Sequence, residues 1–597
     1  MVRDPSVDPR PAGSGCVTRD TTEQSGSDGL AAGVLERLLA AIDERLRIQA
    51  TLDLPDASAV LSSDGTPDSL PTVDEALLVT RADLQVFAAP LFDPARGGRL
   101  IRAGKVVLNV PLRLLGTPQR YFNDVLRRIV ASWSDVLRAS LATQAALLRE
   151  LAAQRDRIDH LAVKLRELET ALGREPAASA PPHLAPEPPS PGAPPSLRIG
   201  LLSRTYPPRP DVGGIARYTR DLAHALAELG HQVHVFTENR QRLRRDGPRL
   251  FVHGLCPDIL PVVPDLPMTD RRLRWSLAVA RCVTDLARAG ERLDVVESQN
   301  WDSEGVALQR SGMGPVVVRV TTPLTVTARH AGWPASADLD ASVQLERWLI
   351  ANASGVTYAT EAVLETARDE LSLEVHGNLR CARIPLGVPP APPGPQPSDP
   401  GRRLLFVGRL ERRKGIGTLL AVVPSLLRRY RDLLVDIVGD DTIAARGEPT
   451  PRERFEAAHE LRFWRRRCRF RGVVDEDRLQ DFYRSCTVFV APSLYESFGL
   501  VYLEAMRWGK PVIGCRAGGI PEVVRDGETG LLVPPDDPVG LEAAITRLLD
   551  DPELRQRLGE RAREALATEF SSRRMAERTA AFYAGVLGCR ATERAIA

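Results

Sequence analysis

Two glutamates separated by seven residues form the most informative pattern in the chain. Glu496 and Glu504 lie in the segment A-P-S-L-Y-E-S-F-G-L-V-Y-L-E-A-M. If this segment is mostly helical, eight steps of 1.5 Å place the carboxylates about 12 Å apart, too far to share a proton or a metal ion. They could instead bind the two ends of a sugar nucleotide, with the backbone amides of Phe498, Gly499 and Leu500 facing its anionic middle.

A second pattern places two cations just beyond an apolar strand. Arg409 and Lys414 occur in L-L-F-V-G-R-L-E-R-R-K-G. Cations at a strand end suit a diphosphate whose charge rises as its bond to a sugar breaks. The alternative is a solvated basic turn, because Arg412 and Arg413 stand alongside and the four cations cannot all be ligands.

A pair of glycines and a strand-end glutamate mark the first half of the α/β region. Gly213 and Gly214 precede a helical pattern, where glycine lets backbone N–H groups approach a phosphate, although a plain turn has the same composition. Their spacing departs from the dinucleotide G-x-G-x-x-G pattern, which argues against NAD. Glu297 ends another strand, either as an acceptor-site residue or as a carboxylate exposed to water.

Short apolar strands alternating with amphipathic helices must position these residues. This alternation is typical of a parallel, doubly wound sheet, and a proline-rich segment at 389–400 divides it into two units. Ligands bind such folds in clefts at the carboxyl ends of the strands. The predicted strands cover 197–202, 232–237, 403–407, 433–438, 487–490, 511–514 and 531–533, and the first helix covers 214–229.

With the further motif A-G-G-I-P-E-V-V-R-D-G-E-T-G-L-L-V-P-P at 517–535, the region from Leu197 to about Phe582 resembles family 4 of the retaining glycosyltransferases. The resemblance implies the GT-B architecture, an α/β fold of two Rossmann-like domains facing a cleft. Residues 197–388 would form the acceptor domain, 389–400 a linker and 401–570 the nucleotide-sugar donor domain. Residues 571–597 would form helices that cross back to the first domain.

The same resemblance implies roles for the residues above. Arg409 and Lys414 would bind the donor diphosphate, Glu496 the transferred sugar and Glu504 the ribose, while the paired glycines close over the phosphates. Such enzymes use no metal or other cofactor, and the leaving phosphate helps to deprotonate the acceptor.

One position departs from the family pattern. Family members commonly carry a histidine where this chain has Thr321, which can form hydrogen bonds but cannot hold a positive charge. His330, nine residues on, either substitutes for it or is a lone surface histidine.

The region before the α/β pattern has a different composition. Residues 1–30 are expected to be disordered, 31–123 mixed and helical, 124–173 a coiled-coil helix and 174–196 a proline-rich linker. The coiled coil could join copies of the chain, or the helix could fold back on its own chain. The basic, leucine-interleaved segment 96–128 is either a peripheral membrane contact or a basic face of a packed helix.

Composition narrows the function classes. A net charge of +2, from 79 basic and 77 acidic residues, gives no whole-chain field that favours nucleic acid. The eight cysteines lack metal-ligand spacing, and neither a signal peptide nor a run of ~18 apolar residues is evident. We therefore expect a cytoplasmic location, with an option of contact at the inner face of the cell membrane.

The expected activity is transfer of a sugar, from a UDP or GDP sugar by preference, to a saccharide or lipid-linked acceptor in surface polysaccharide or glycoconjugate synthesis. Two alternatives remain open at this point. One is an inactive GT-B scaffold that binds nucleotide sugar, and the other is a nucleotide-sugar epimerase or hydrolase of the same fold.

Overall fold

The protein is described here from a computed structural model. The structure describes residues 33–47, 196–208, 213–239, 243–257, 261–373, 379–392, 401–442, 448–459 and 466–596. The predictions for 1–30, the coiled coil 124–173, the basic segment 96–128 and almost all of the linker 174–196 fall outside these ranges, as do residues 393–400 of the second linker. Within the described ranges, no helix is long and apolar enough to cross a bilayer.

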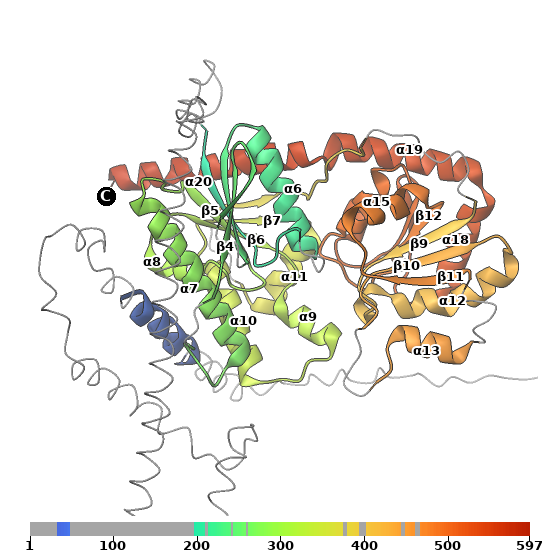
Figure 1. The fold of residues 1–597 in the computed structure, drawn as a ribbon, viewed down its shortest axis with the longest axis horizontal. Coiled ribbons are helices and arrows are strands. Elements are labelled where there is room, and N and C mark those ends of the chain that lie inside the picture. The colour runs from blue at the N-terminus through green and yellow to red at the C-terminus, as the bar shows by residue number, and fades with distance from the viewer. Residues whose placement is uncertain are drawn as a thin grey trace, which may run out of the picture. The chain divides into compact units, whose positions relative to one another are not determined.

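The first domain is built on a sheet with the order β3-β4-β2-β1-β5-β6-β7-β8 in the described residues (Figure 1). Neighbouring strands are parallel except for the β3–β4 pair. The strands are β1 (Arg198–Leu202), β2 (Gln232–Glu238), β3 (Leu243–Gly247), β4 (Leu250–Leu255), β5 (Val295–Gln299), β6 (Val316–Val320), β7 (Gly355–Tyr358) and β8 (Cys381–Arg383). The helices are α6 (Gly214–Glu228), α7 (Pro267–Arg288), α8 (Val306–Ser311), α9 (Leu324–Ala331), α10 (Ala337–Ala351) and α11 (Glu361–Leu371).

The second domain has a parallel sheet with the order β11-β10-β9-β12-β13-β14, which is the strand order of a Rossmann fold. Its strands are β9 (Arg403–Val407), β10 (Leu434–Val438), β11 (Cys468–Gly472), β12 (Val488–Val490), β13 (Val512–Cys515) and β14 (Gly530–Val533). The helices are η3 (Arg412–Lys414), α12 (Ile416–Arg429), α13 (Pro451–Ala458), α15 (Glu476–Ser485), α16 (Leu500–Met506), α17 (Ile520–Val523), α18 (Pro538–Asp550) and α19 (Pro552–Glu569). Every predicted strand is present within two residues of its predicted ends, and the two α/β domains are confirmed.

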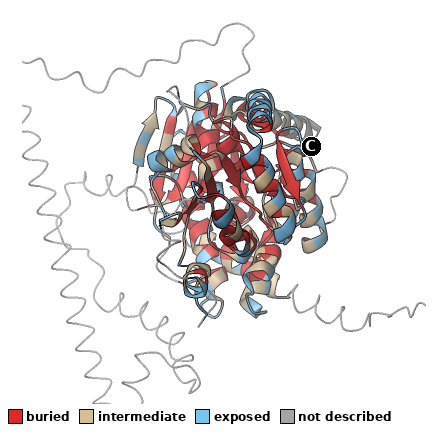
Figure 2. Cartoon of the chain, turned by 90° about the vertical axis from the view of Figure 1, so that its right-hand side faces the viewer, coloured by how far each residue is buried: buried red, intermediate tan, exposed pale blue. Residues whose placement is uncertain are grey.

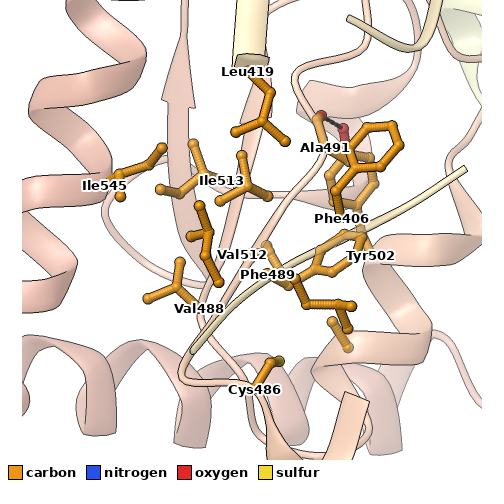
Figure 3. Close-up of a cluster of buried hydrophobic side chains, with 14 of the residues drawn as sticks. Phe406, Leu419, Cys486, Val488, Phe489, Ala491, Tyr502, Val512, Ile513 and Ile545 are labelled. Carbon is orange, nitrogen blue, oxygen red and sulfur yellow. Dashed lines mark hydrogen bonds between the residues drawn. The ribbon is translucent and has the colours of Figure 1, made fainter. Parts of the chain in front are cut away.

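The core of the second domain explains why its strands read as continuous apolar runs. Helices cover both faces of this parallel sheet, so successive side chains are buried along β12, β13 and β14 and in the middle of β9 and β10, whereas the edge strand β11 is mostly half-buried (Figure 2). Figure 3 shows Phe489 and Ile513 of two neighbouring strands packed with Leu419 and Tyr502 of the covering helices. The hydroxyl of Tyr502 donates a 2.6 Å hydrogen bond to the carbonyl of Ala491, which anchors the loop that follows β12.

The chain returns to the first domain at its carboxyl end. An isolated β-bridge between Val388 and Ser571 joins the two segments in which the chain passes from one domain to the other. Helix α20 (Ser572–Ile596) follows and packs along α6 (Figure 1). The buried side chains of Met575 and Tyr583 belong to the same core as β1 and β2. The sequence predicted more than one helix here, whereas the structure has a single one.

A helix at 33–47 joins the first domain from far upstream. Leu38 and Ile42 are buried in the core that α7 and α8 also form, and Asp43 is paired with Arg310. The region 31–123, predicted to be mixed and helical, therefore contains a helix at 33–47. Its packing was not predicted, because the proline-rich segment before residue 197 had suggested that everything upstream was separate.

Candidate active site

The predicted donor residues meet where the second sheet reverses its strand order. Strands β9 and β12 are neighbours although η3, the helices α12, α13 and α15 and the strands β10 and β11 lie between them in the described sequence. Arg409 follows β9 and Glu496 follows β12, so both lie at the carboxyl edge where doubly wound sheets bind ligands.

Lys414 and Glu496 form the centre of this site. Nζ of Lys414 lies 2.5 Å from Oε1 of Glu496, and the hydroxyl of Ser493 donates to the same oxygen at 3.0 Å. Arg413 approaches the other oxygen, Oε2, at 3.5 Å, and donates to the carbonyl of Tyr495 at 3.1 Å. The carboxylate is thus surrounded by donors, and the alternative of a solvated basic turn is wrong for Lys414 and Arg413.

The two charges stabilise each other against burial. Burial by itself raises the pKa of Glu496, but Lys414 and Arg413 outweigh that effect and leave the pKa below its ordinary value. Burial lowers the pKa of Lys414, and Glu496 opposes the shift. Because the carboxylate stays ionised, Glu496 can accept hydrogen bonds from the hydroxyls of a bound ligand.

Two glycines allow this close packing. Gly415 has φ +69°, and a Cβ there would lie 1.8 Å from the carbonyl oxygen of Pro492. Gly518 has φ +53°, and its Cβ would lie 2.4 Å from the carbonyl oxygen of Glu496. Only glycine lets the turn after η3 and the A-G-G-I-P motif contact the backbone of the loop that carries Glu496.

Arg409 is exposed, unlike Lys414 and Arg413. Its side chain is 55% exposed and lies 3.1 Å from Glu411, whose same oxygen accepts a 2.8 Å hydrogen bond from Arg413. An exposed guanidinium beside a partly neutralised carboxylate can reorient toward an anion.

Glu504 lies on α16 and is buried. One oxygen is paired with Arg217 of α6, and the other accepts a 2.7 Å hydrogen bond from the hydroxyl of Tyr483 on α15. The helix begins only at Leu500, so Glu496 precedes it in a loop. The helical premise behind the 12 Å separation is therefore wrong, because Gly499 adopts a left-handed conformation with φ +97° and starts the helix late.

The glycine pair lies at the start of α6, as predicted. Gly213 is the residue before the helix and Gly214 its first residue. A Cβ on Gly214 would contact Leu500 at 3.8 Å, so this turn lies beside the start of α16. Gly214 of the first domain therefore lies close to Leu500, the residue that follows Gly499 in the second domain.

Glu297 is buried, so the prediction of a carboxylate exposed to water is wrong. It is 1% exposed, and its oxygens accept hydrogen bonds from Tyr218 at 2.6 Å and Tyr583 at 2.7 Å. Glu297 is the middle residue of β5, and its side chain points to the sheet face covered by α6 and α20 rather than to the strand ends. With both oxygens bonded, we do not carry its acceptor-site role forward.

Thr321 follows β6 at the carboxyl ends of the strands of the first sheet, where a series of side-chain hydrogen bonds holds it. Its backbone N–H and its hydroxyl donate to Oδ1 of Asn300 at 2.7 and 2.8 Å, and Asn300 donates to the buried Glu346 at 2.5 Å. His330 is not a lone surface residue, because its ring centroid lies 6.0 Å from that of Tyr495 in the donor domain. Burial lowers the pKa of His330 below its ordinary value, and the positive charge of Arg413 lowers it further.

Sequence reasoning missed four residues that contact the predicted glutamates. Arg413 stands in a run of basic residues, and neither Ser493 nor Tyr483 belongs to a recognisable motif. Arg217 stands in G-G-I-A-R-Y, directly after the glycine pair, but nothing local indicates that it contacts the second domain.

Comparison with known proteins agrees with this geometry. The family model for group 1 glycosyl transferases matches residues 394–565, and the model for glycosyltransferase family 4 matches residues 212–392. A D-inositol 3-phosphate glycosyltransferase of Catenulispora acidiphila is 36% identical over 62% of this chain and 91% of its own. A glycogen synthase of Mycobacterium tuberculosis is 28% identical over 65% and 94%.

A solved structure supports the fold. The sucrose-phosphate synthase of Thermosynechococcus elongatus superposes with a TM-score of 0.53 at 26% identity, covering 66% of this chain and all of that one. Together with the paired glutamates and cations at the sheet edge, these matches mean that the chain belongs to glycosyltransferase family 4, and it is a nucleotide-sugar-dependent glycosyltransferase of the GT-B fold.

Proposed function

We propose that the protein transfers a sugar, with retention of its anomeric configuration, from a UDP or GDP sugar to a saccharide or lipid-linked acceptor in surface polysaccharide or glycoconjugate synthesis. The single observation that carries the proposal is the buried Lys414–Glu496 pair at the switch point of the donor sheet, with the exposed Arg409 beside it.

The donor would lie across this edge. Arg409 and Lys414 bind the diphosphate, Glu496 accepts from hydroxyls of the transferred sugar, and Glu504 accepts from the ribose. As the bond between the anomeric carbon and the diphosphate breaks, negative charge grows on the leaving oxygen, and the fixed cations stabilise it. The acceptor oxygen bonds to the anomeric carbon, and its proton passes to the leaving phosphate.

The acceptor would lie against the first domain. Relatives are named for acceptors as different as inositol phosphate and glycogen, which share several hydroxyl groups. We therefore propose that the acceptor is a polyhydroxylated molecule, and we do not choose among the molecules of this class.

A ligand panel tests the donor half of the proposal. Thermal unfolding is measured with UDP, GDP, ADP and their common sugar conjugates, since a ligand bound only by the native state raises Tm by mass action. We expect a selective rise with one nucleotide, and no rise with any of them would contradict the proposal. With the donor named, Glu496→Ala should abolish transfer to acceptor extracts, and normal turnover by that variant would also contradict it.

The upstream region gives two further proposals, both on residues outside the described ranges. The segment 96–128 would bring the enzyme to an anionic lipid surface, where lipid-linked acceptors reside, and 124–173 would join copies of the chain. Flotation with anionic vesicles tests the first and sedimentation the second. Each experiment compares the full chain with a deletion variant. Because the helix 33–47 packs in the first domain, this variant should lack only residues within 56–194.

A further inference from the structure

Arg217 connects the two domains at the residue proposed to bind the ribose. It lies on α6 of the first domain, and its guanidinium is paired with Glu504 on α16 of the second. The other terminal nitrogen lies 3.1 Å from Glu476, the first residue of α15. The side chain of Arg217 is only 17% exposed, so the contact is shielded from water.

The pair determines how the Glu504 carboxylate is held. Arg217 donates to one oxygen, and Tyr483 donates to the other. A carboxylate has about four acceptor positions, so two donors leave room for two ligand hydroxyls. Without Arg217, this buried carboxylate would lose its paired cation and would no longer be held in one orientation.

We propose that Arg217 is a positioning residue that fixes Glu504 for the vicinal hydroxyls of the donor ribose, so that ribose binding depends on the contact between the domains. This inference rests on the proposed function, in which Glu504 is the ribose ligand. The first domain would then contribute to donor binding through a side chain that never touches the donor.

Arginine suits this role better than lysine. Its planar guanidinium presents two terminal nitrogens, one to Glu504 and one to Glu476, and its orientation is thereby set by two helices. A lysine has one ammonium group and could pair with one carboxylate in several orientations. Arg217→Lys should therefore keep the charge but lose part of the positioning.

The test compares nucleotides that differ only in the hydroxyls that Glu504 would bind. Affinities for UDP, GDP and ADP and for their 2′,3′-dideoxy counterparts are measured by calorimetry with the full chain. The wild type should prefer the ribonucleotide of its donor. In Arg217→Gln the ribonucleotide affinity should fall by about tenfold, the effect of losing a charge-assisted hydrogen bond, while the dideoxy affinity stays the same.

A matched control separates positioning from general contact between the domains. Glu522→Gln weakens another ion pair between the domains, with Arg383 at 2.9 Å, and leaves Glu504 untouched. Its ratio of ribonucleotide to dideoxy affinity should equal that of the wild type. An equal fall of the ratio in this control would overturn the proposal.

Each remaining outcome has one meaning. A wild-type ratio in Arg217→Gln overturns the positioning role and leaves the proposed function intact. Failure of the wild type to bind any nucleotide, or equal wild-type affinity for the ribo and dideoxy forms, refutes the ribose role of Glu504 instead. If Arg217→Gln does not fold, Arg217→Lys is measured, with an intermediate ratio expected and an unchanged ratio overturning the proposal.

Discussion

The ammonium group of Lys414 lies 2.5 Å from a carboxylate oxygen of Glu496, and neither side chain is more than 18% exposed. Two opposite charges held this close stabilise each other, so one site holds both the cation that the proposed phosphate binding requires and the anion that the proposed binding of sugar hydroxyls requires.

Lys414→Met should lower kcat/KM for the donor by about 10²- to 10³-fold, because it removes a fixed charge from the site where the leaving phosphate develops its own. Steady-state kinetics with the donor that the ligand panel identifies provides the measurement. Arg412→Met is the control, since Arg412 is an exposed neighbour in η3, and it should stay within about twofold of the wild type. Equal effects of the two substitutions would contradict the assignment.

Tyr583→Phe should lower the free energy of unfolding by about 1–3 kcal/mol, because it leaves one oxygen of the buried Glu297 without a donor. Tyr430→Phe is the matched control. Its partner Asp550 is 44% exposed, so water can replace the lost hydroxyl and the change should be under about 0.5 kcal/mol. Denaturant unfolding measures both, and a neutral Tyr583→Phe would show that Glu297 does not depend on α20.

Ile42→Ala should cost about 2–5 kcal/mol, since Ile42 is fully buried in the core of the first domain. Arg37→Ala, on the exposed side of the same helix, should change stability by less than about 0.5 kcal/mol. Unfolding of the full chain distinguishes them. If both were neutral, the helix 33–47 would contribute nothing to the domain against which it packs.

Glu304→Gln should change how stability depends on pH. Burial, together with the nearby Asp302, raises the pKa of Glu304 to about 8 from an ordinary value of 4.5. Between these values the folded state holds a proton that the unfolded state has lost, so the wild type loses stability as pH rises through this window, by at most about 1.4 kcal/mol per pH unit. The substituted protein lacks this titration.

Stability curves from pH 5 to pH 9 check this prediction. The advantage of Glu304→Gln over the wild type should grow with pH and level off above about pH 8. Glu291→Gln serves as an exposed control, and its difference from the wild type should not grow in the same way. Parallel curves for Glu304→Gln and the wild type would contradict the raised pKa.

Local patterns predicted the strands well. They also singled out Glu496 and Lys414 in two separate motifs, and the structure brings these two side chains into contact at the carboxyl edge of the second sheet. The strands of the second domain are buried on both faces, and their continuous apolar runs are visible in the sequence.

What the sequence could not reveal depends on contacts between distant segments. The same continuous runs hide which way a strand residue points, and for that reason the burial of Glu297 could not be predicted. The pairing of Arg217 with Glu504 joins residues 287 positions apart. No property of either segment alone indicates that pairing, because it follows from how α6 meets α16.

The packing of 33–47 and α20 against one domain also sets an order on biosynthesis. The upstream helix leaves the ribosome more than 200 residues before α7, its partner, is made, which is roughly 10 to 50 seconds at ordinary rates of translation. Tyr583 arrives after the whole donor domain has been synthesised. The first domain, although begun earlier, must therefore complete its core last, and during that interval the nascent chain exposes apolar faces that a chaperone would recognise.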